Sequence, residues 1–484
     1  MNPQHPNLNN NLDDEALKSL IANLKNEVPK IQVLGKEDEG YREGIARWSG
    51  AAEKEAALVV FPTTAEDVSK IVLFAKANNL DFAVVGGGHG SSGSSSTHNG
   101  LSLNLSKMRN VTIDPLTKSA LCQGGCLWTD VDTAASTHGL AAVGGTVNHT
   151  GIGGLTLGGG YGFLTPKYGM VIDNLLEAEI VLANGQIVTC SAHQEPDLFW
   201  AIRGAGISFG VATSFTYRLH PQPNRVWGGI LVFPREKLEA IISFANTIVS
   251  PSEEKALLLL GFGAPPPAFQ PAILTPIFYN GPEAEARAYY QPLFALEPLA
   301  DTTQEMDYVN ANTMLNEPMA HGLRRNMKGA ACMLPLTYTF AAEIFSETEK
   351  FLRETPDAKY TMVIFEYIPF GKILQVGQQE TAFANRGAYG NLLFGPGWEE
   401  EATDQKCREW CRRMARKAKG ELERRMEEGT DEITRDGVGA YSNYDGADHE
   451  GGRLVYGINY PRLAQLKKKY DPENLFSKGP DLVS

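Results

Sequence analysis

The stretch AVVGGGHGSSGSSS, residues 83–96, decides the fold of this chain. An apolar run leads through three consecutive glycines into His89, and serines then dominate the loop. Glycines let backbone amides approach a ligand closely, and successive N–H groups with neighbouring hydroxyls bind anions. The stretch therefore predicts a loop that binds a pyrophosphate. A flexible Gly/Ser linker is the alternative, which is disfavoured because the loop follows directly on an apolar strand.

The segments around this loop predict a strand–helix–strand unit. ALVVFP (57–62) and LDFAVVGGG (80–88) have the composition of short buried strands. The helix between them is predicted to begin with a capping box of Thr64 and Asp67, and apolar residues then follow at helical spacing. Ligands bind at the exit loop of such a unit. No helix follows the glycines and no Gly-Lys-Ser/Thr closes them, which argues against a nicotinamide-binding fingerprint and a P-loop.

A second glycine-rich stretch, GIGGLTLGGGYGFLTPKYG, covers residues 151–169. Two such loops, about 60 residues apart, are suited to hold one long dinucleotide between them. The segment LLEAEIVLANGQIVT that follows predicts a β-hairpin with Asn-Gly at its turn.

Composition narrows the class of protein. The chain has 484 residues, which predicts two or three domains, and its net charge of −13 argues against partners such as nucleic acid or an anionic membrane. We find no signal peptide and no apolar stretch of membrane-spanning length. Six cysteines without a CxxC motif indicate buried free thiols rather than a metal site. We therefore expect a cytoplasmic protein without a metal.

Two parts of the chain resemble known proteins. Residues 57–221 resemble the PCMH-type FAD-binding domain of the vanillyl-alcohol oxidase superfamily, and residues 441–476 resemble the tail of the berberine bridge enzyme. The stretches that carry the resemblance are VVGGGHGSSG, GIGGLTLGGGYGFLTPKYGMVIDNLLEAEIVLANGQIV, DLFWAIRGAGISFGVATSFTYRL and YSNYDGADHEGGRLVYGINYPRLAQLKKKYDPENLF.

The resemblance implies an α+β fold. It assigns residues 1–225, with a core of 57–221, to the FAD-binding domain. Residues 226–430 would form an inserted substrate-binding domain, built on an antiparallel sheet covered by helices. Residues 431–484 would be the berberine-bridge-like segment that returns to the FAD-binding domain.

The resemblance also gives His89 a role. In this family the histidine after the glycines is bonded covalently to the 8α-methyl carbon of the flavin, and His89 occupies that position. Many relatives add a second bond through a cysteine, where this chain has Val147, so we expect one covalent bond. Thr150 lies near the position that gates oxygen access, which leaves oxidase and dehydrogenase open. Asn459 matches an asparagine that hydrogen-bonds the flavin in relatives.

The loops and the resemblance together predict one set of cofactor-binding residues. These are Gly86, Gly87, Gly88, His89, Gly90, Ser91, Thr146, His149, Thr150, Gly153, Gly154, Gly159, Gly160, Gly162, Gly210, Val211 and Asn459.

Three side chains are candidates for the catalytic base. Flavin oxidation takes a hydride from carbon and usually a proton from the adjacent oxygen or nitrogen, which a base assists. Tyr441 and Tyr444 of YSNY face opposite ways if this segment is a strand, and the resemblance favours Tyr441. The alternative is that both rings only pack the tail against the FAD-binding domain. Glu366, in the apolar strand VIFEYIPFG, is the third candidate because burial raises the pKa of a carboxyl. A carboxylate facing water is the alternative there.

Together these features predict an FAD-dependent oxidoreductase. We expect oxidation of an alcohol, an amine or a C–H group of a small organic molecule by hydride transfer to covalently bound FAD, with O2 as acceptor giving H2O2. A flavin-dependent dehydrogenase or an oxidative cyclase of secondary metabolism is the alternative, and a non-catalytic flavoprotein is the third. We expect a monomer or a homodimer.

Overall fold

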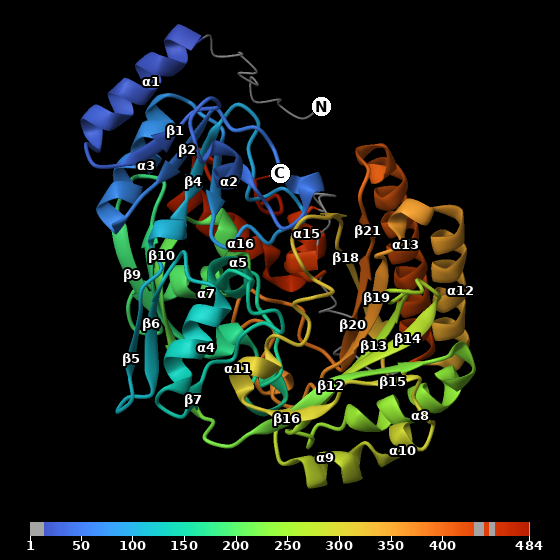
Figure 1. The fold of residues 1–484 in the computed structure, drawn as a ribbon. Helices are drawn as coiled ribbons and strands as arrows, with labels where there is room; N and C mark the ends of the chain where they lie inside the picture. Colours follow the sequence, from blue (N-terminus) through green and yellow to red (C-terminus); the bar gives the residue numbers. More distant parts are fainter. Residues whose placement is uncertain (1–13, 430–439, 445–450, 484) are drawn as a thin grey trace.

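A four-stranded sheet forms the N-terminal part of the molecule (Figure 1). The computed structural model describes residues 14–429, 440–444 and 451–483. The order β1-β2-β4-β3 places β4 between the two strands of the predicted strand–helix–strand unit, and β2, β4 and β3 are parallel. The strands are β1 (Gln32–Leu34), β2 (Leu58–Phe61), β3 (Phe82–Val85) and β4 (Leu101–Asn104). The helices of this part are α1 (Asp14–Glu27), α2 (Tyr41–Ile45) and α3 (Ala65–Ala77), and α3 begins at the predicted capping box.

A second, antiparallel sheet of five strands follows in the order β5-β6-β10-β8-β9. Its strands are β5 (Val111–Asp114), β6 (Ser119–Gln123), β8 (Leu175–Val181), β9 (Ile187–Ser191) and β10 (Val211–Arg218). The hairpin β8–β9 turns at the predicted Asn-Gly, and Gly185 there has a φ of 80°. The helices of this part are α4 (Trp128–Ser136), α5 (Ile152–Leu157), α6 (Thr165–Tyr168) and α7 (Pro196–Ala205).

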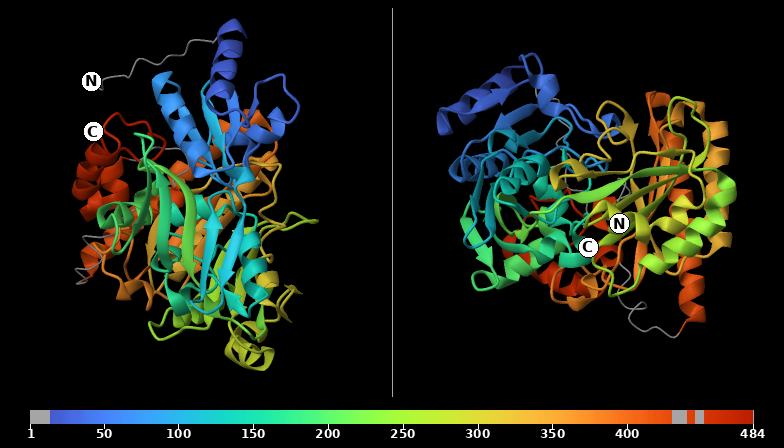
Figure 2. Two further views of the ribbon diagram at one scale, coloured as in Figure 1. Left: turned by 90° about the vertical axis from the view of Figure 1, so that its left-hand side faces the viewer. Right: turned by 60° about the horizontal axis from the view of Figure 1, so that its bottom comes forward.

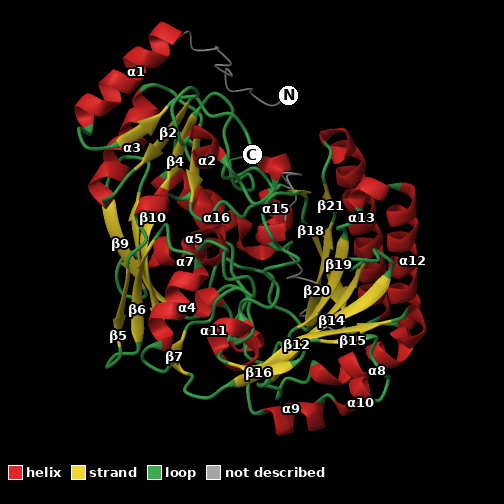
Figure 3. Cartoon of the chain, in the orientation of Figure 1, coloured by secondary structure: helices red, strands yellow, loops and turns green. Residues whose placement is uncertain are grey.

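The third sheet is antiparallel and stands opposite the first two (Figure 1). Its strands are β12 (Val226–Phe233), β13 (Ala256–Gly263), β14 (Ala272–Tyr279), β15 (Ala300–Asp301), β16 (Gln304–Met306), β18 (Lys328–Met333), β19 (Met362–Tyr367) and β20 (Tyr389–Gly395). Helices cover its outer face (Figure 3): α8 (Leu238–Ile248), α9 (Glu283–Tyr289), α10 (Gln291–Phe294), α12 (Tyr338–Glu354) and α13 (Asp404–Glu428). The predicted α+β fold, with an antiparallel sheet covered by helices, is confirmed.

The strands of the third sheet sort their side chains by alternation. On β19, Val363, Phe365 and Tyr367 are at most 1% exposed and pack toward the helices. The residues between them, Ile364 and Glu366, face the other way and line a cavity. Because side chains alternate between the faces of a strand, the inner face of this sheet is available to form a site.

The C-terminal segment returns to the second sheet. The helices α15 (Gly452–Tyr456) and α16 (Tyr460–Tyr470), red in Figure 2, lie beside that sheet, and α16 packs against α7. The ammonium of Lys467 is buried; it is 2.6 Å from Oδ2 of Asp471 and donates to the carbonyl of Ser208. Within the stretch that resembles the berberine bridge enzyme, residues 445–450 lie outside the described residues.

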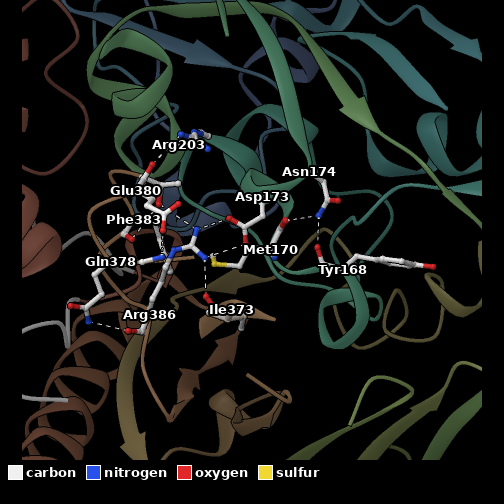
Figure 4. Close-up of polar contacts among 12 residues, drawn as sticks. Tyr168, Met170, Asp173, Asn174, Arg203, Ile373, Gln378, Glu380, Phe383 and Arg386 are labelled. Atoms are coloured by element: carbon white, nitrogen blue, oxygen red, sulfur yellow. Dashed lines mark hydrogen bonds and ion pairs between the residues drawn. The ribbon is translucent and has the colours of Figure 1, made fainter. Parts of the chain in front are cut away.

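A buried ion pair connects the third sheet to the second glycine-rich stretch (Figure 4). Arg386, in the segment between β19 and β20, donates two hydrogen bonds to Asp173, of 2.6 and 3.1 Å. The side chain of Arg386 is 1% exposed and that of Asp173 is 8% exposed. Oδ2 of Asp173, which accepts the 3.1 Å bond from Arg386, also accepts a hydrogen bond from the backbone N–H of Met170. This carboxylate therefore holds a turn next to the glycines and anchors a segment of the opposite sheet.

Candidate active site

A cavity lies between the two glycine-rich loops, the inner face of the third sheet and the C-terminal segment. Most of the residues predicted to bind cofactor or to act in catalysis line it. These are Gly86, Gly87, Gly88, His89, Gly90, Ser91, Thr146, Thr150, Gly153, Gly154, Gly162, Gly210, Glu366, Tyr441 and Tyr444. Segments that are far apart in the chain thus meet at one place.

The two loops touch backbone to backbone at Gly87 and Gly151. A Cβ on Gly87 would lie 2.4 Å from the backbone nitrogen of Gly151, and a Cβ on Gly151 would lie 2.3 Å from that of Gly87. Neither approach is possible for a residue with a side chain, because real Cβ atoms do not come this close to backbone. The glycines therefore bring the loops together as well as exposing their amides.

Five of the predicted cofactor-binding residues do not line the cavity: His149, described below, and four residues that pack behind it. Gly159 and Gly160 have φ values of 123° and 86°, and Cβ atoms there would meet the ring of Phe383 at 2.9 Å and the side chain of Val171 at 2.6 Å. Val211, at the start of β10, is buried in the core. The fourth residue is Asn459.

Asn459 stabilises a neighbouring segment of the chain. Its side-chain amide donates to the carbonyls of Gln378 at 2.7 Å and Thr381 at 3.1 Å, and the residue is 3% exposed. The structure therefore does not bring Asn459 to the cavity wall. These contacts give it a packing role that the sequence pattern does not indicate.

His89 lies in a cluster of rings. It stacks on Trp48 with ring centroids 4.5 Å apart and an interplanar angle of 14°. Its Nε2 is 3.1 Å from Nδ1 of His149, and the ring of His321 is 4.9 Å from that of His149. Burial, together with the neighbouring histidines and Arg325, lowers the pKa of His89 well below its usual range. His89 is thus neutral near pH 7 and retains a ring nitrogen able to act as a nucleophile.

The prediction from sequence includes His89 and His149 but misses Trp48 and His321. No pattern in the chain relates them, since Trp48 follows the helix α2 and His321 belongs to a loop before β18. Tertiary packing alone brings them together. His149 does not line the cavity itself, but it contacts the ring that does.

A carboxyl group and phenols gather on the opposite wall. Oε1 of Glu366 accepts a hydrogen bond of 2.8 Å from the hydroxyl of Tyr444, and Oε2 accepts one of 2.9 Å from the side-chain amide of Asn391. Burial raises the pKa of Glu366, while these two hydrogen bonds oppose the rise. The hydroxyl of Tyr161 is hydrogen-bonded by Asn391 and its ring lies 5.2 Å from that of Tyr441.

The expectation that Tyr441 and Tyr444 face opposite ways is wrong. Ser442–Tyr444 forms a turn of 3-10 helix, closed by a 2.9 Å hydrogen bond from the N–H of Tyr444 to the carbonyl of Tyr441. The two rings are 4.7 Å apart and both line the cavity. A turn replaces the alternation of a strand, and the two phenols face the cavity from the same side.

The electrostatics separate the roles of the carboxyl and the phenols. Burial raises the pKa of Tyr441, and that of Tyr444 rises further with the charge of Glu366 beside it. Both phenols therefore stay protonated at neutral pH, and the hydroxyl of Tyr444 donates to Glu366. A carboxylate whose pKa is raised is a stronger base than usual when it is ionised. Glu366 is the group best suited to take a proton.

The rest of this wall is aliphatic. Leu257, Leu259, Ile364, Ile368 and Leu393 line the cavity from three adjacent strands or their ends. The prediction from sequence does not name them, although they occupy alternate positions of apolar strands. At the other end of the cavity lies Lys478, whose ammonium is 2.6 Å from Asp81.

The described residues hold neither a metal cluster nor a membrane-spanning helix. Among residues 14–429, 440–444 and 451–483, no group of three or more His, Cys, Asp or Glu side chains is arranged to hold a metal ion. In the same residues, no helix is both long and apolar enough to cross a membrane.

Known proteins match most of the chain. Two family models match, an FAD binding domain over residues 56–191 and a berberine and berberine-like segment over residues 440–478. The FAD-linked oxidoreductase pgmH of Aspergillus terreus is 32% identical over 485 residues, which cover 96% of each chain.

Solved structures match over a similar length. The structure of 6-hydroxy-D-nicotine oxidase from Arthrobacter nicotinovorans has a TM-score of 0.79 at 26% identity, covering 94% of this chain and 98% of that one. Xylooligosaccharide oxidase from Myceliophthora thermophila has a TM-score of 0.77 at 21% identity, covering 96% and 99%, and shows the fold alone.

Proposed function

Because the chain belongs to the berberine-bridge-like family of FAD-linked oxidoreductases, we propose that it oxidises a small organic molecule by hydride transfer to FAD bound covalently through His89. The membership of this family and the class of enzyme, both predicted from the sequence, are confirmed. The acceptor in this proposal is O2, which is reduced to H2O2. We assign the cofactor to residues 1–225 and 431–484, and the substrate to residues 226–430.

The residues around the cavity fit FAD. The hydroxyl of Ser95 is buried without a hydrogen-bond partner in the protein, and Ser95 lines the cavity. A Cβ on Gly154, which also lines the cavity, would meet nothing within 4 Å. These features leave a free donor for a phosphate and room for a flat ring. FAD, when bound, supplies the two-electron acceptor.

His89 is proposed to attach the cofactor. The supporting observation is a neutral imidazole that is stacked on Trp48 and oriented by His149. The sequence has no cysteine at position 147, which supports attachment through His89 alone. A histidyl bond fixes the ring and tunes its reduction potential.

The single observation that carries the reaction is the position of Glu366. Its carboxyl group lies on the inner face of the third sheet, across the cavity from the glycine loops, and is held by Tyr444 and Asn391. We assign Glu366 as the general base, which takes the proton from the hydroxyl or amine of the substrate as the hydride leaves the neighbouring carbon. Tyr444 orients the base, and Tyr441 contacts the substrate.

The experiment compares the flavin before and after contact with substrate. Denatured protein is weighed by mass spectrometry, and a mass of one FAD above the chain is expected. The native protein is then mixed without air with alcohols, amines, sugars and phenols, and the absorbance of the flavin is followed. Bleaching by one class and recovery in air with release of peroxide support an oxidase. Bleaching that air does not reverse supports a dehydrogenase, and protein without flavin contradicts the proposal.

A further inference from the structure

The inner face of the third sheet restricts the chemistry of the substrate. We propose that this substrate is an apolar, uncharged molecule with one O–H or N–H donor at the reacting carbon, rather than a saccharide or an anion. This inference rests on the proposed function, because it describes the substrate of the same cavity. It concerns the side chains around Glu366, because the proposed reaction by itself does not determine which substrates they admit.

The register of the strands places Glu366 within an apolar surface. Leu259 on β13 and Asn391 on β20 flank Glu366 on β19, so the three form one row across the sheet. In the next row, Ile364 pairs with Leu393. A substrate that reaches the carboxyl group therefore lies against Leu259 on one side of it and against Ile364 and Leu393 in the next row.

Asn391, Tyr444 and Asn443, at the wall around Glu366, already have partners within the protein. The amide of Asn391 and the hydroxyl of Tyr444 both donate to Glu366. The amide of Asn443 donates to the carbonyl of Leu155 at 3.2 Å and to the hydroxyl of Tyr441 at 2.9 Å. A saccharide brings many hydroxyl groups, and each one that loses water without gaining a partner weakens binding. A molecule with one donor group loses nothing in this way.

The charges of the wall exclude an anion. Among the described residues that line the cavity, Lys478 is the only lysine or arginine. Its ammonium pairs with Asp81, which precedes β3, so it belongs to the side of the first sheet. A carboxylate or phosphate group of a substrate beside Glu366 would meet a like charge without a cation to balance it, and like charges in a buried site repel strongly.

Three compounds, one apolar and neutral, one anionic and one a saccharide, test the inference. They are 4-methylbenzyl alcohol, its charged analogue 4-(hydroxymethyl)benzoate, and xylobiose. Dissociation constants for the FAD-loaded protein are measured by calorimetry, which does not depend on turnover. We expect the alcohol to bind at least about 10-fold more tightly than either of the others, since a single methylene in an apolar pocket changes discrimination about 10–200-fold.

A pair of variants locates the effect. Ile364→Asn places an amide in the wall and is expected to weaken binding of the alcohol about 10–200-fold while leaving xylobiose unchanged or improved. Leu299→Asn, at a surface position that is 68% exposed, is the matched control and should leave all three constants as in the wild type. Ile364→Ala, which removes volume without adding a polar group, should weaken the alcohol without improving xylobiose.

The results distinguish a failure of this inference about the substrate from a failure of the proposed oxidoreductase function. Binding of xylobiose or of the benzoate as tight as that of the alcohol overturns the inference, and so does the absence of measurable binding for all three. Flavin reduction by xylobiose alone also overturns it, while the oxidoreductase function stands. If the alcohol binds in the expected order but no compound of any class reduces the flavin, the proposed function fails and the description of the wall remains.

Discussion

Replacing Glu366 by glutamine tests the assignment of the base. The substitution keeps the shape of the side chain and removes its charge. The carboxylate accepts two hydrogen bonds, from Tyr444 and Asn391, whereas the amide oxygen of glutamine can replace only one of its oxygens as an acceptor. We expect the loss of the base to slow flavin reduction by about 10²–10⁴-fold, which corresponds to about 3–5 kcal/mol in the activation barrier.

The assay is single-turnover reduction of the flavin without air, at saturating substrate. FAD content and substrate affinity should change little, because the cavity keeps its shape. Glu239→Gln, at an exposed position of α8 on the outer side of the sheet, is the control and should reduce its flavin as fast as the wild type. Reduction of the Glu366→Gln flavin within about threefold of the wild-type rate would refute the assignment, since even the lower end of general-base catalysis is about 10²-fold.

The pH profile gives an independent check on the same residue. A base works in its ionised form, so the reduction rate should fall as pH decreases through the pKa of Glu366, which burial raises above the usual carboxyl value. The hydrogen bond from Tyr444 favours the ionised form and lowers this pKa. Tyr444→Phe should therefore move the acid limb to higher pH, and in Glu366→Gln this limb should disappear. A limb that stays in place in Glu366→Gln belongs to another group.

Three further changes test the attachment, the loops and the anchor behind them. His89→Ala should lose its flavin on denaturation in acid, and mass spectrometry that still finds one FAD on the denatured variant would exclude His89 as the attachment site. Gly87→Ala should yield protein without FAD because the new Cβ would overlap the second loop, whereas Gly420→Ala, in the open middle of α13, should bind FAD normally and gain about 0.5–1 kcal/mol in stability. Asp173→Asn leaves the charge of Arg386 buried without its partner and should lower the free energy of unfolding by about 3–5 kcal/mol; a loss below 1 kcal/mol in denaturant titrations would show that the pair does not anchor the segment.

Local patterns in the sequence predict much of the fold because they are satisfied locally. The capping box of Thr64 and Asp67 forms as a reciprocal pair of hydrogen bonds at the start of α3. The Asn-Gly turn closes β8 against β9. Glycine-rich runs identify both loops of the cavity, since few other features of a chain require so many positions without a side chain.

The ring cluster at His89 could not be predicted from local patterns in the sequence. Trp48 stacks on the imidazole of His89. Arg325 lies over the ring of Trp48, with its guanidinium carbon 5.1 Å from the ring centroid. The environment that keeps His89 neutral thus depends on residues from three separate parts of the chain. Periodicity describes one element at a time and carries no information about such a meeting.

The assignment of the base changes for the same reason. The resemblance favours Tyr441, and in a strand its neighbour Tyr444 would turn away from the flavin. The structure has a turn, and it also has a place for the second ring: a Cβ on Gly329 of β18 would lie 2.8 Å from Cβ of Tyr444. Gly329 pairs with Leu393 on β20, so the absence of a side chain at one edge of the sheet lets Tyr444 reach Glu366. The hydroxyl of Tyr444 donates to the buried carboxylate and fixes its orientation. This relation between a glycine, a tyrosine and a glutamate on separate segments supports our proposal that Glu366, rather than Tyr441, is the base.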